Sequence, residues 1–152
     1  DCLVGSEMCI RDSYITIHIS SGLNALKVAK KFSGKTKLIG VTILTSLNNK
    51  SLKEIGFDKD VKKLVFHQAK LAAKAKLDGI VCSPHEIKIV KKVFKKEIIT
   101  PGIRLRGDTK GDQKRVMTPK QALKFGATAL VMGRSLTGNI KKNIQKLIQE
   151  LN

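Results

Sequence analysis

Residues 99–118 read Ile-Thr-Pro-Gly-Ile-Arg-Leu-Arg-Gly-Asp-Thr-Lys-Gly-Asp-Gln-Lys-Arg-Val-Met-Thr, a short apolar strand that runs directly into a long loop of glycines, cations and amides. A second apolar run, residues 129–132, ends in the same way at Gly133-Arg134-Ser135. Backbone N–H groups, a helix N-terminus and an Arg side chain bind phosphate after the last two strands of a parallel α/β barrel. The two stretches together predict a parallel α/β fold with a phosphorylated ligand.

The rest of the chain alternates apolar strands with helical segments, the pattern of repeated βα units around a parallel sheet. The expected strands are residues 14–19, 37–44, 79–82, 98–100 and 127–132. The expected helices run to about residue 32, over 61–75, from 84, from 119 to 125 and over 139–151.

Five βα units are too few for a closed barrel, which has eight strands and about 250 residues. The loops with anion-binding chemistry follow the fourth and fifth strands, so we number these strands seventh and eighth. The predicted fold is therefore a partial TIM (β/α)8 barrel made of its last five βα units, strands four to eight. An open, doubly wound five-stranded sheet is the structural alternative.

Three local signals set helix boundaries. Ser83-Pro84-His85-Glu86 and Thr118-Pro119-Lys120-Gln121 each place a hydroxyl at the N-cap, Pro at the first helical position and Glu or Gln three residues after the cap. Both predict a capping box. Gly126 suits the left-handed position that ends a helix.

The chain of 152 residues carries 30 Lys and Arg against 12 Asp and Glu, a formal net charge of +18. The excess is mostly Lys spread along the expected helices. Aromatic residues make up only 4%, so stacking platforms for single-stranded nucleic acid are scarce. We interpret the charge as a solvated helix surface and expect no specific nucleic-acid partner.

Three further features concern compartment and domain limits. No apolar run reaches 18 residues, so we expect no membrane partner. Three cysteines form no disulfide framework and no signal peptide is visible, which indicates the cytoplasm. Residues 1–12 lack the periodic pattern that follows, and we expect a non-native leader there. Residues 13–152 are then the C-terminal part of one barrel domain.

Five motifs occur in the order and near the spacing of one known family. They are Val41-Thr42-Ile43-Leu44-Thr45-Ser46, Leu77-Asp78-Gly79-Ile80-Val81-Cys82-Ser83, Thr100-Pro101-Gly102-Ile103-Arg104, Gly111-Asp112-Gln113-Lys114-Arg115-Val116-Met117-Thr118-Pro119 and Val131-Met132-Gly133-Arg134-Ser135. From about residue 14 to the C-terminus, the chain resembles the orotidine 5′-phosphate decarboxylases of the bacterial type. The resemblance implies a (β/α)8 barrel that converts orotidine 5′-phosphate to UMP and CO2 without a cofactor. It also implies a homodimer for the full-length protein.

The resemblance implies substrate-binding roles for five residues. Thr45 resembles the hydroxyl residue that contacts the pyrimidine ring through its side chain and backbone N–H. Gln113 resembles the amide that bridges the phosphate loop and the base. Arg134 resembles the Arg that binds phosphate, and Gly133 allows the backbone to approach the dianion closely. Arg104 corresponds to a further ligand-contacting Arg, although the neighbouring Arg106 shows that such a side chain can simply be solvated.

The catalytic motif of that family, Asp-x-Lys-x-x-Asp on the third barrel strand, does not occur in the chain. Residues 60–65 carry Val where the last Asp belongs, and residues 108–112 are one residue short. We therefore assign no catalytic residue and expect this chain alone to be inactive. His18, expected in the strand interior, and His67 and His85, expected on helix surfaces, have no partners that suggest a metal set, so we predict no metal.

Two other functions remain open on the sequence. A sister barrel with the same phosphate grip, such as a hexulose-phosphate synthase or a sugar-acid phosphate decarboxylase, is the nearest enzyme alternative. A basic, noncatalytic binding module is the alternative from another class.

Overall fold

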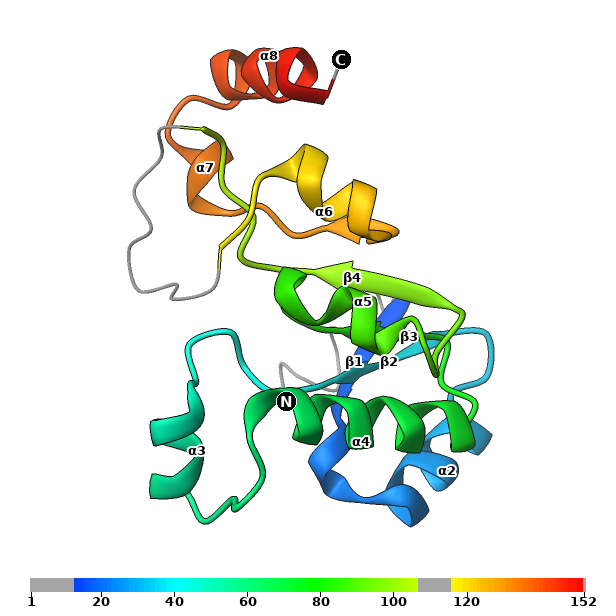
Figure 1. The fold of residues 1–152 in the computed structure, drawn as a ribbon. Helices are drawn as coiled ribbons and strands as arrows, with labels where there is room; N and C mark the ends of the chain where they lie inside the picture. The colour runs from blue at the N-terminus through cyan, green and yellow to red at the C-terminus, as the bar shows by residue number, and fades with distance from the viewer. Residues whose placement is uncertain (1–12, 107–115, 152) are drawn as a thin grey trace, which may run out of the picture.

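The computed structural model describes residues 13–106 and 116–151 (Figure 1). The strands are β1 (Tyr14–His18), β2 (Lys37–Val41), β3 (Gly79–Val81), β4 (Glu97–Thr100) and β5 (Ala129–Leu130). The α-helices are α2 (Leu23–Phe32), α3 (Asn49–Glu54), α4 (Val61–Lys74), α5 (Ile87–Val90), α6 (Pro119–Phe125), α7 (Arg134–Thr137) and α8 (Ile140–Leu151). Two 3-10 turns, η1 (Ile19–Ser21) and η2 (Pro84–Glu86), follow β1 and β3.

All five strands are parallel and lie in one sheet in the order β1-β2-β3-β4-β5. A doubly wound sheet reverses its strand order at a switch point, so this order excludes the alternative architecture. The helices follow the same sequence: α2 packs on α4, α4 on α5, α5 on α6, and α6 on α8. Successive parallel strands beside successive helices are the arrangement of a barrel segment.

Helices cover one face of the sheet, and that face is buried. Gly40 belongs to it, because a Cβ at this position would lie 2.7–2.9 Å from Leu77 and Ile19 side-chain atoms. In the strand register Gly40 lies beside Ile80, which lies beside Ile98. Both isoleucines are buried in the main hydrophobic core. The core of the protein therefore lies between the sheet and its helices.

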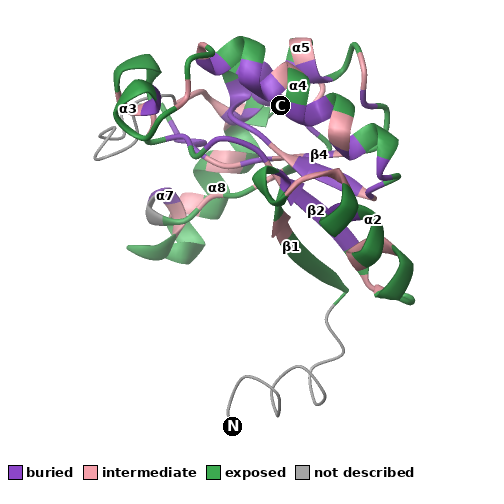
Figure 2. Ribbon diagram, turned by 90° about the horizontal axis from the view of Figure 1, so that it is seen from below, coloured by how far each residue is buried: buried purple, intermediate pink, exposed green. Residues whose placement is uncertain are grey.

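The opposite face of the sheet is open toward the carboxyl ends of its strands, whereas Ile39 on the same face, nearer the amino ends, is fully buried. Its register row nearest the carboxyl ends consists of His18, Val41, Val81, Ile99 and Ala129. Each of these residues is exposed or only partly buried, and Figure 2 shows the exposed strand β1 beside the buried β2. The prediction that His18 lies in the interior is wrong, because His18 ends the edge strand β1 and is exposed there.

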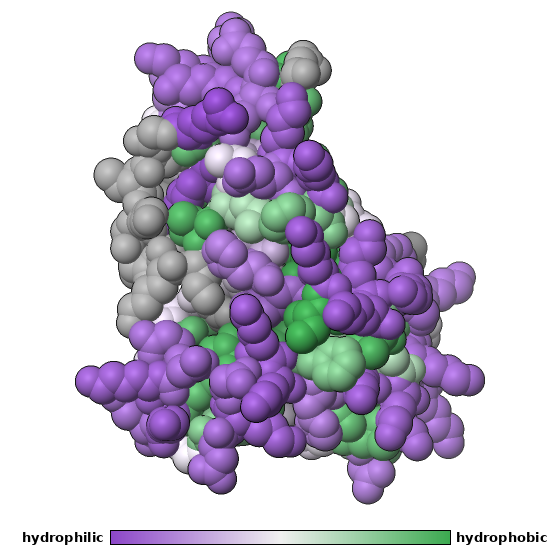
Figure 3. Space-filling model, viewed as in Figure 1, coloured by the Kyte–Doolittle hydropathy of each residue, from purple (hydrophilic) through white to green (hydrophobic). Residues whose placement is uncertain are grey.

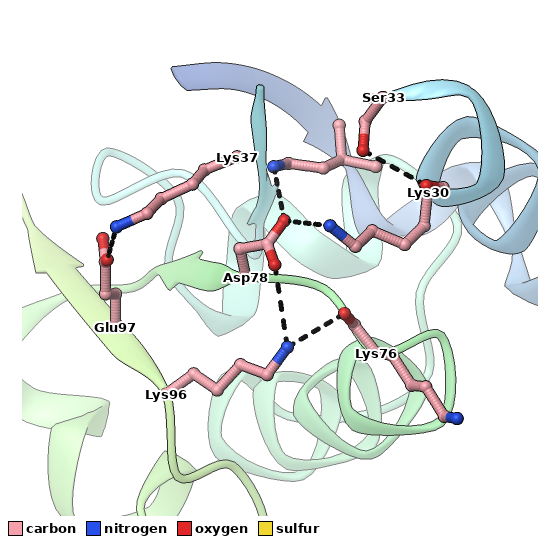
Figure 4. Close-up of polar contacts among 8 residues, drawn as sticks. Lys30, Ser33, Lys37, Lys76, Asp78, Lys96 and Glu97 are labelled. Carbon is pink, nitrogen blue, oxygen red and sulfur yellow. Dashed lines mark hydrogen bonds and ion pairs between the residues drawn. The ribbon is translucent and has the colours of Figure 1, made fainter. Parts of the chain in front are cut away.

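The amino ends of the strands are tied together by Asp78 (Figure 4). The Asp78 carboxylate accepts hydrogen bonds from the Leu38 N–H at 2.9 Å and from Lys30 Nζ at 2.5 Å, and Lys96 Nζ lies 3.7 Å away. Burial raises the pKa of this carboxyl, but Lys30, the Leu38 N–H and Lys96 together outweigh burial and hold the pKa below its usual value. Asp78 thus joins β2, β3 and helix α2 at one edge of the sheet.

Helix α4 illustrates how the sequence pattern produces the helix layer. The Asp60 side chain caps it by accepting the Lys63 N–H at 2.8 Å, and buried apolar residues recur at helical spacing on its inner face. Its outer face carries exposed lysines, and Lys70 lies 4.6 Å from the centre of the Phe66 ring. Hydrophilic side chains likewise dominate the surface in Figure 3, with apolar side chains in patches between them.

Several boundaries differ from the expected ones. Strands β2 and β5 are shorter, and the polar connection after β2 contains the helix α3, which Asn48 caps by accepting the Ser51 N–H at 2.9 Å. The capping box predicted at Ser83 does not form: η2 is a 3-10 turn in which the Glu86 N–H bonds the Ser83 carbonyl instead of its hydroxyl. At Thr118 the predicted N-cap is confirmed, because the Thr118 hydroxyl accepts the Gln121 N–H; the Gln121 side chain accepts from that hydroxyl and not from the Thr118 N–H of a full capping box. Gly126 ends α6 at φ 104°, as predicted.

Candidate functional site

The carboxyl ends of the parallel strands meet at one edge of the sheet, opposite the edge that holds Asp78. After β4 the chain turns through Gly102, at φ 79°, into buried Ile103 and Arg104. The Arg104 N–H donates to the Met117 carbonyl at 3.1 Å, and the Met117 N–H donates to the Gly102 carbonyl at 3.3 Å. These two bonds join the ends of the loop that the sequence marks as anion-binding.

Arg104 and Arg106 have different environments although they are two residues apart. Arg104 is 9% exposed, and its Nη1 donates to the Ile103 carbonyl at 2.9 Å. Within residues 13–106 and 116–151, no carboxylate forms an ion pair with Arg104. Arg106 is exposed, and its backbone N–H donates to Glu150 of α8 at 3.3 Å. A buried guanidinium needs a compensating anion, so Arg104 is the better candidate for ligand binding.

The neighbouring strand β5 leads to Gly133 at the start of α7. Gly133 is exposed, its φ is −96°, and a Cβ built there would meet no atom within 4 Å. Neither a left-handed backbone nor protein packing therefore accounts for glycine at this position. Gln113 lies outside the described residues, as does the side chain of Arg134, so their predicted convergence on one phosphate stays a prediction.

Thr45 lies at the same edge but farther along the sheet. It follows β2, is 9% exposed, and lies just before the cap of α3. Strand β3 separates β2 from β4 in the sheet, so Thr45 and Arg104 follow strands that are not neighbours. The structure thus places Thr45, Arg104 and Gly133 at one edge of the sheet.

Buried hydroxyls without a hydrogen-bond partner among the described residues also lie at this edge, at Ser83, Thr100 and Ser135, and sequence reasoning did not assign them to the site. Ser135, next to Arg134 in α7, is 6% exposed, and its hydroxyl has no hydrogen-bond partner among the described residues. Buried hydroxyls are generally hydrogen-bonded, so Ser135 is a further polar group at the site. Its place directly after Gly133-Arg134 was the signal that could have found it.

A cavity of about 840 Å³ also opens on this side of the molecule, between α4 and η2, with Asn48, Asp60 and His85 in its wall. Of the predicted site residues that the structure describes, Thr45, Arg104 and Gly133 do not line it. Asp60, which begins the closest sequence match to the missing catalytic motif, is here the N-cap of α4. Its pKa is lowered, chiefly by the hydrogen bond from the Lys63 N–H. We therefore assign this cavity no catalytic role.

The described residues form neither a metal cluster nor a membrane-spanning helix. Among the described residues no group of three His, Cys, Asp or Glu side chains is close enough to hold a metal ion. His67 and His85 are exposed, as predicted, and Cys82 is a buried thiol. No helix within the described part of the chain is long and apolar enough to cross a membrane.

Five sequential parallel strands, with helices on one face and a buried Arg and an exposed Gly at their carboxyl ends, define the chain as a segment of a βα barrel. A family model described as "Orotidine 5'-phosphate decarboxylase / HUMPS family" matches residues 12–145. The chain belongs to this family.

Individual relatives agree with the family match. An orotidine 5′-phosphate decarboxylase of Coxiella burnetii is 46% identical over 132 residues, which cover 81% of this chain and 56% of the relative. The enzyme of Prochlorococcus marinus strain AS9601 is 45% identical and is covered over 59% of its length. The chain thus spans somewhat more than half the length of the curated relatives it matches.

Solved structures show the same fold. The orotidine 5′-phosphate decarboxylase of Lactobacillus acidophilus superposes with a TM-score of 0.74 at 29% identity, over 92% of this chain and 63% of that one. The enzyme of Methanocaldococcus jannaschii, solved with the inhibitor BMP, superposes with a TM-score of 0.68 at 21% identity, over 92% of this chain and 62% of that one.

Proposed function

We propose that the chain is the phosphate-binding portion of an orotidine 5′-phosphate decarboxylase, the enzyme that converts orotidine 5′-phosphate to UMP and CO2. The family match and the curated relatives support the enzyme class. The observation that carries the ligand assignment is Arg104, a buried cation at the end of β4 with no carboxylate partner among the described residues. A phosphate or nucleotide ligand would supply a compensating negative charge.

The proposed site combines groups from three strand ends. Arg104 and Arg134 contribute guanidinium groups, and Gly133 lets the backbone approach the phosphate. Gln113 links the phosphate to the base, and Thr45 contacts the pyrimidine ring. Open space around Gly133 supports this arrangement, because a ligand can approach the backbone there without displacing protein atoms.

The chemical step needs groups outside this set. In the family that the chain resembles, a Lys ammonium stabilises the carbanion at C6 of the pyrimidine and protonates it, with Asp residues holding the charge array. The corresponding motif is not in the sequence. We therefore assign substrate binding to this chain and expect it to produce no UMP alone. Remote phosphate binding in such enzymes lowers the barrier at the reacting centre.

Several finer features belong to the same proposal. The five βα units correspond to strands four to eight of the barrel, and residues 1–12 are a leader foreign to the domain. The full-length enzyme acts in the cytoplasm as a homodimer. The exposed row at the carboxyl ends of the inner face supports a partial barrel, because five strands leave the barrel interior uncovered.

Ligand-detected NMR with UMP and uridine tests the assignment. We expect the chain to bind UMP but not uridine, and Arg104→Ala to weaken UMP binding by about tenfold or more. Arg106→Ala is the matched control, because Arg106 is exposed, and we expect it to leave UMP binding unchanged.

Three outcomes would contradict the proposal. Equal binding of UMP and uridine would show that the phosphate group is not recognised. Salt-sensitive binding of duplex DNA with no response to UMP would favour the basic binding module. A preference for hexulose phosphates over UMP would favour a sister barrel, although the curated relatives reported above are orotidine 5′-phosphate decarboxylases.

A further inference from the structure

A cavity of about 380 Å³ lies in the helix layer, between η1, the connection from α3 to α4, and α4 itself. Ile19 of η1 and Leu64 of α4 are buried in its wall, and Phe57 and Leu71 are partly buried there. Small-molecule sites are typically clefts of about 300–1,000 Å³ with apolar walls and a few polar groups. This cavity has the size and the walls of such a site.

Gln68 supplies a polar group. It belongs to α4, lines the cavity and is only 4% exposed. Its Oε1 is buried and has no hydrogen-bond partner among the described residues. An unpaired buried acceptor lowers the stability of the fold, and such atoms are rare in proteins. Every other buried residue of α4 is apolar, so packing alone does not explain an amide at this position.

Backbone turns hold the walls of the cavity in place. Gly56, at φ 85°, follows α3, and the Phe57 N–H then donates to the Leu52 carbonyl at 2.9 Å. This bond fixes the position of Phe57 in the wall. At η1, the Gly22 N–H donates to the Ile19 carbonyl at 3.2 Å. The cavity is therefore formed before a ligand arrives, which reduces the entropic cost of binding.

The rim of the cavity carries both signs of charge. Ser20, Asp58, Lys59 and His67 are exposed and line it. One carboxylate beside one ammonium gives no strong preference for an anion or a cation. The apolar walls disfavour a charged ligand, because a charge loses its hydration there. The cavity thus suits a neutral molecule.

We propose that this cavity binds a neutral aromatic ring compound whose N–H donates a hydrogen bond to Gln68 Oε1. The last bond of a Gln side chain rotates over a broad energy profile, so a small turn of the amide aims Oε1 at the ligand. The ring would lie against Phe57 and the aliphatic side chains of the wall. Thr45, Arg104 and Gly133 do not line this cavity, so the inference does not depend on the proposed function.

Indole and N-methylindole are matched probes, because they share an apolar ring system and differ in the N–H. An NMR titration of the full 152-residue chain follows the side-chain amide signal of Gln68. We expect indole to shift that signal and to bind about tenfold more tightly than N-methylindole, which leaves Oε1 unpaired. No binding of indole, or equal affinity for the two probes, would overturn the proposal.

Gln68→Leu removes the acceptor while keeping a side chain of similar size. We expect the affinity for indole to fall to that of N-methylindole, with the affinity for N-methylindole not reduced. Gln145→Leu makes the same change at an exposed position of α8 and should leave both affinities unchanged. If Gln68→Leu binds indole as tightly as the parent chain, Oε1 is not the acceptor and the proposal is wrong.

Ser20→Trp tests the location without changing the core. Ser20 is exposed at the rim, so a Trp there narrows the cavity and should weaken indole binding about tenfold or more, with an unchanged circular dichroism spectrum. Undiminished binding of indole by this folded variant would place the probe elsewhere and contradict the proposal.

The two proposals can fail separately. If UMP displaces indole, the cavity belongs to the nucleotide site and this inference is wrong. If the chain binds indole as expected but does not bind UMP, the proposed function is wrong and the indole site stands.

Discussion

Replacing Asp78 with Ala measures how much stability the amino edge of the sheet holds apart from the ligand edge. The carboxylate accepts the Leu38 N–H at 2.9 Å and Lys30 Nζ at 2.5 Å, and the Lys30 and Asp78 side chains are only 27% and 21% exposed. A hydrogen bond to a charged acceptor contributes about 1.5–3 kcal/mol, and a partly exposed ion pair adds about 0.2–1 kcal/mol. We expect Asp78→Ala to lower the free energy of unfolding by about 3 kcal/mol.

Asp78→Asn separates the two contributions. The amide oxygen still accepts the Leu38 N–H while the charge is lost, so we expect a loss of about 1 kcal/mol. Glu97→Gln is the control, because it removes the exposed Lys37–Glu97 ion pair at the same edge and should change stability little. Urea unfolding followed by circular dichroism gives all three values. Equal, small losses for Asp78→Ala and Glu97→Gln would refute the reasoning.

The effect of Asp78 has a defined pH dependence. Its pKa in the folded protein lies below the ordinary value of 3.8, so its ionised form stabilises the fold. That contribution is fully present above the pKa of the unfolded chain and is lost as the pH falls through the lower folded pKa. Asp78→Asn should flatten the stability profile below about pH 4. UMP binding by the folded variant should be unchanged at neutral pH, because the site lies at the opposite edge of the sheet.

Substitutions at Gly40 and Thr118 test the packing of the helix layer and the cap of α6. Gly40→Ala should lower the free energy of unfolding by about 1–3 kcal/mol, because the added Cβ would lie 2.7 Å from Leu77. The control Gly138→Ala, whose Cβ would meet nothing within 4 Å, should change stability by less than about 0.5 kcal/mol. Similar unfolding midpoints in urea for the two variants would contradict this prediction. Thr118→Ala should lower the free energy of unfolding by about 1 kcal/mol, because it removes the cap of α6. Thr118→Ser keeps the capping hydroxyl and should retain most of that stability. If Thr118→Ser is as unstable as Thr118→Ala, the lost stability comes from the methyl group and not from the cap.

Local signals in the sequence predicted the parts of the fold that depend on neighbours along the chain. Thr118 caps α6 and Gly126 ends it, as expected from residue type and spacing. At Ser83 the same signal failed, because the chain forms a single 3-10 turn there and Glu86 is drawn into the protein interior. Tertiary packing overrode the local preference.

The burial of single side chains at the site could not be predicted. Arg104 and Arg106 are equivalent in the sequence, since both lie in the same short stretch after β4. The pairing of Ile103 with Met117 distinguishes them, because it draws Arg104 into the structure while Arg106 continues into the loop. That pairing joins residues 14 positions apart, and no local pattern specifies it. The exposure of His18 likewise depends on which strands border β1.

The two hydrogen bonds between Arg104, Met117 and Gly102 act on the site through geometry more than through loop entropy. The two bonds reduce the number of residues between the fixed ends of the loop from about 17 to about 12, and loop-closure theory gives about 0.3 kcal/mol for that change. A misdirected guanidinium, in contrast, loses charge-assisted hydrogen bonds of about 1.5–3 kcal/mol each. The bonds therefore matter chiefly because they fix the direction in which Arg104 leaves the sheet. A ligand at this edge would therefore meet a cation whose position the backbone already fixes.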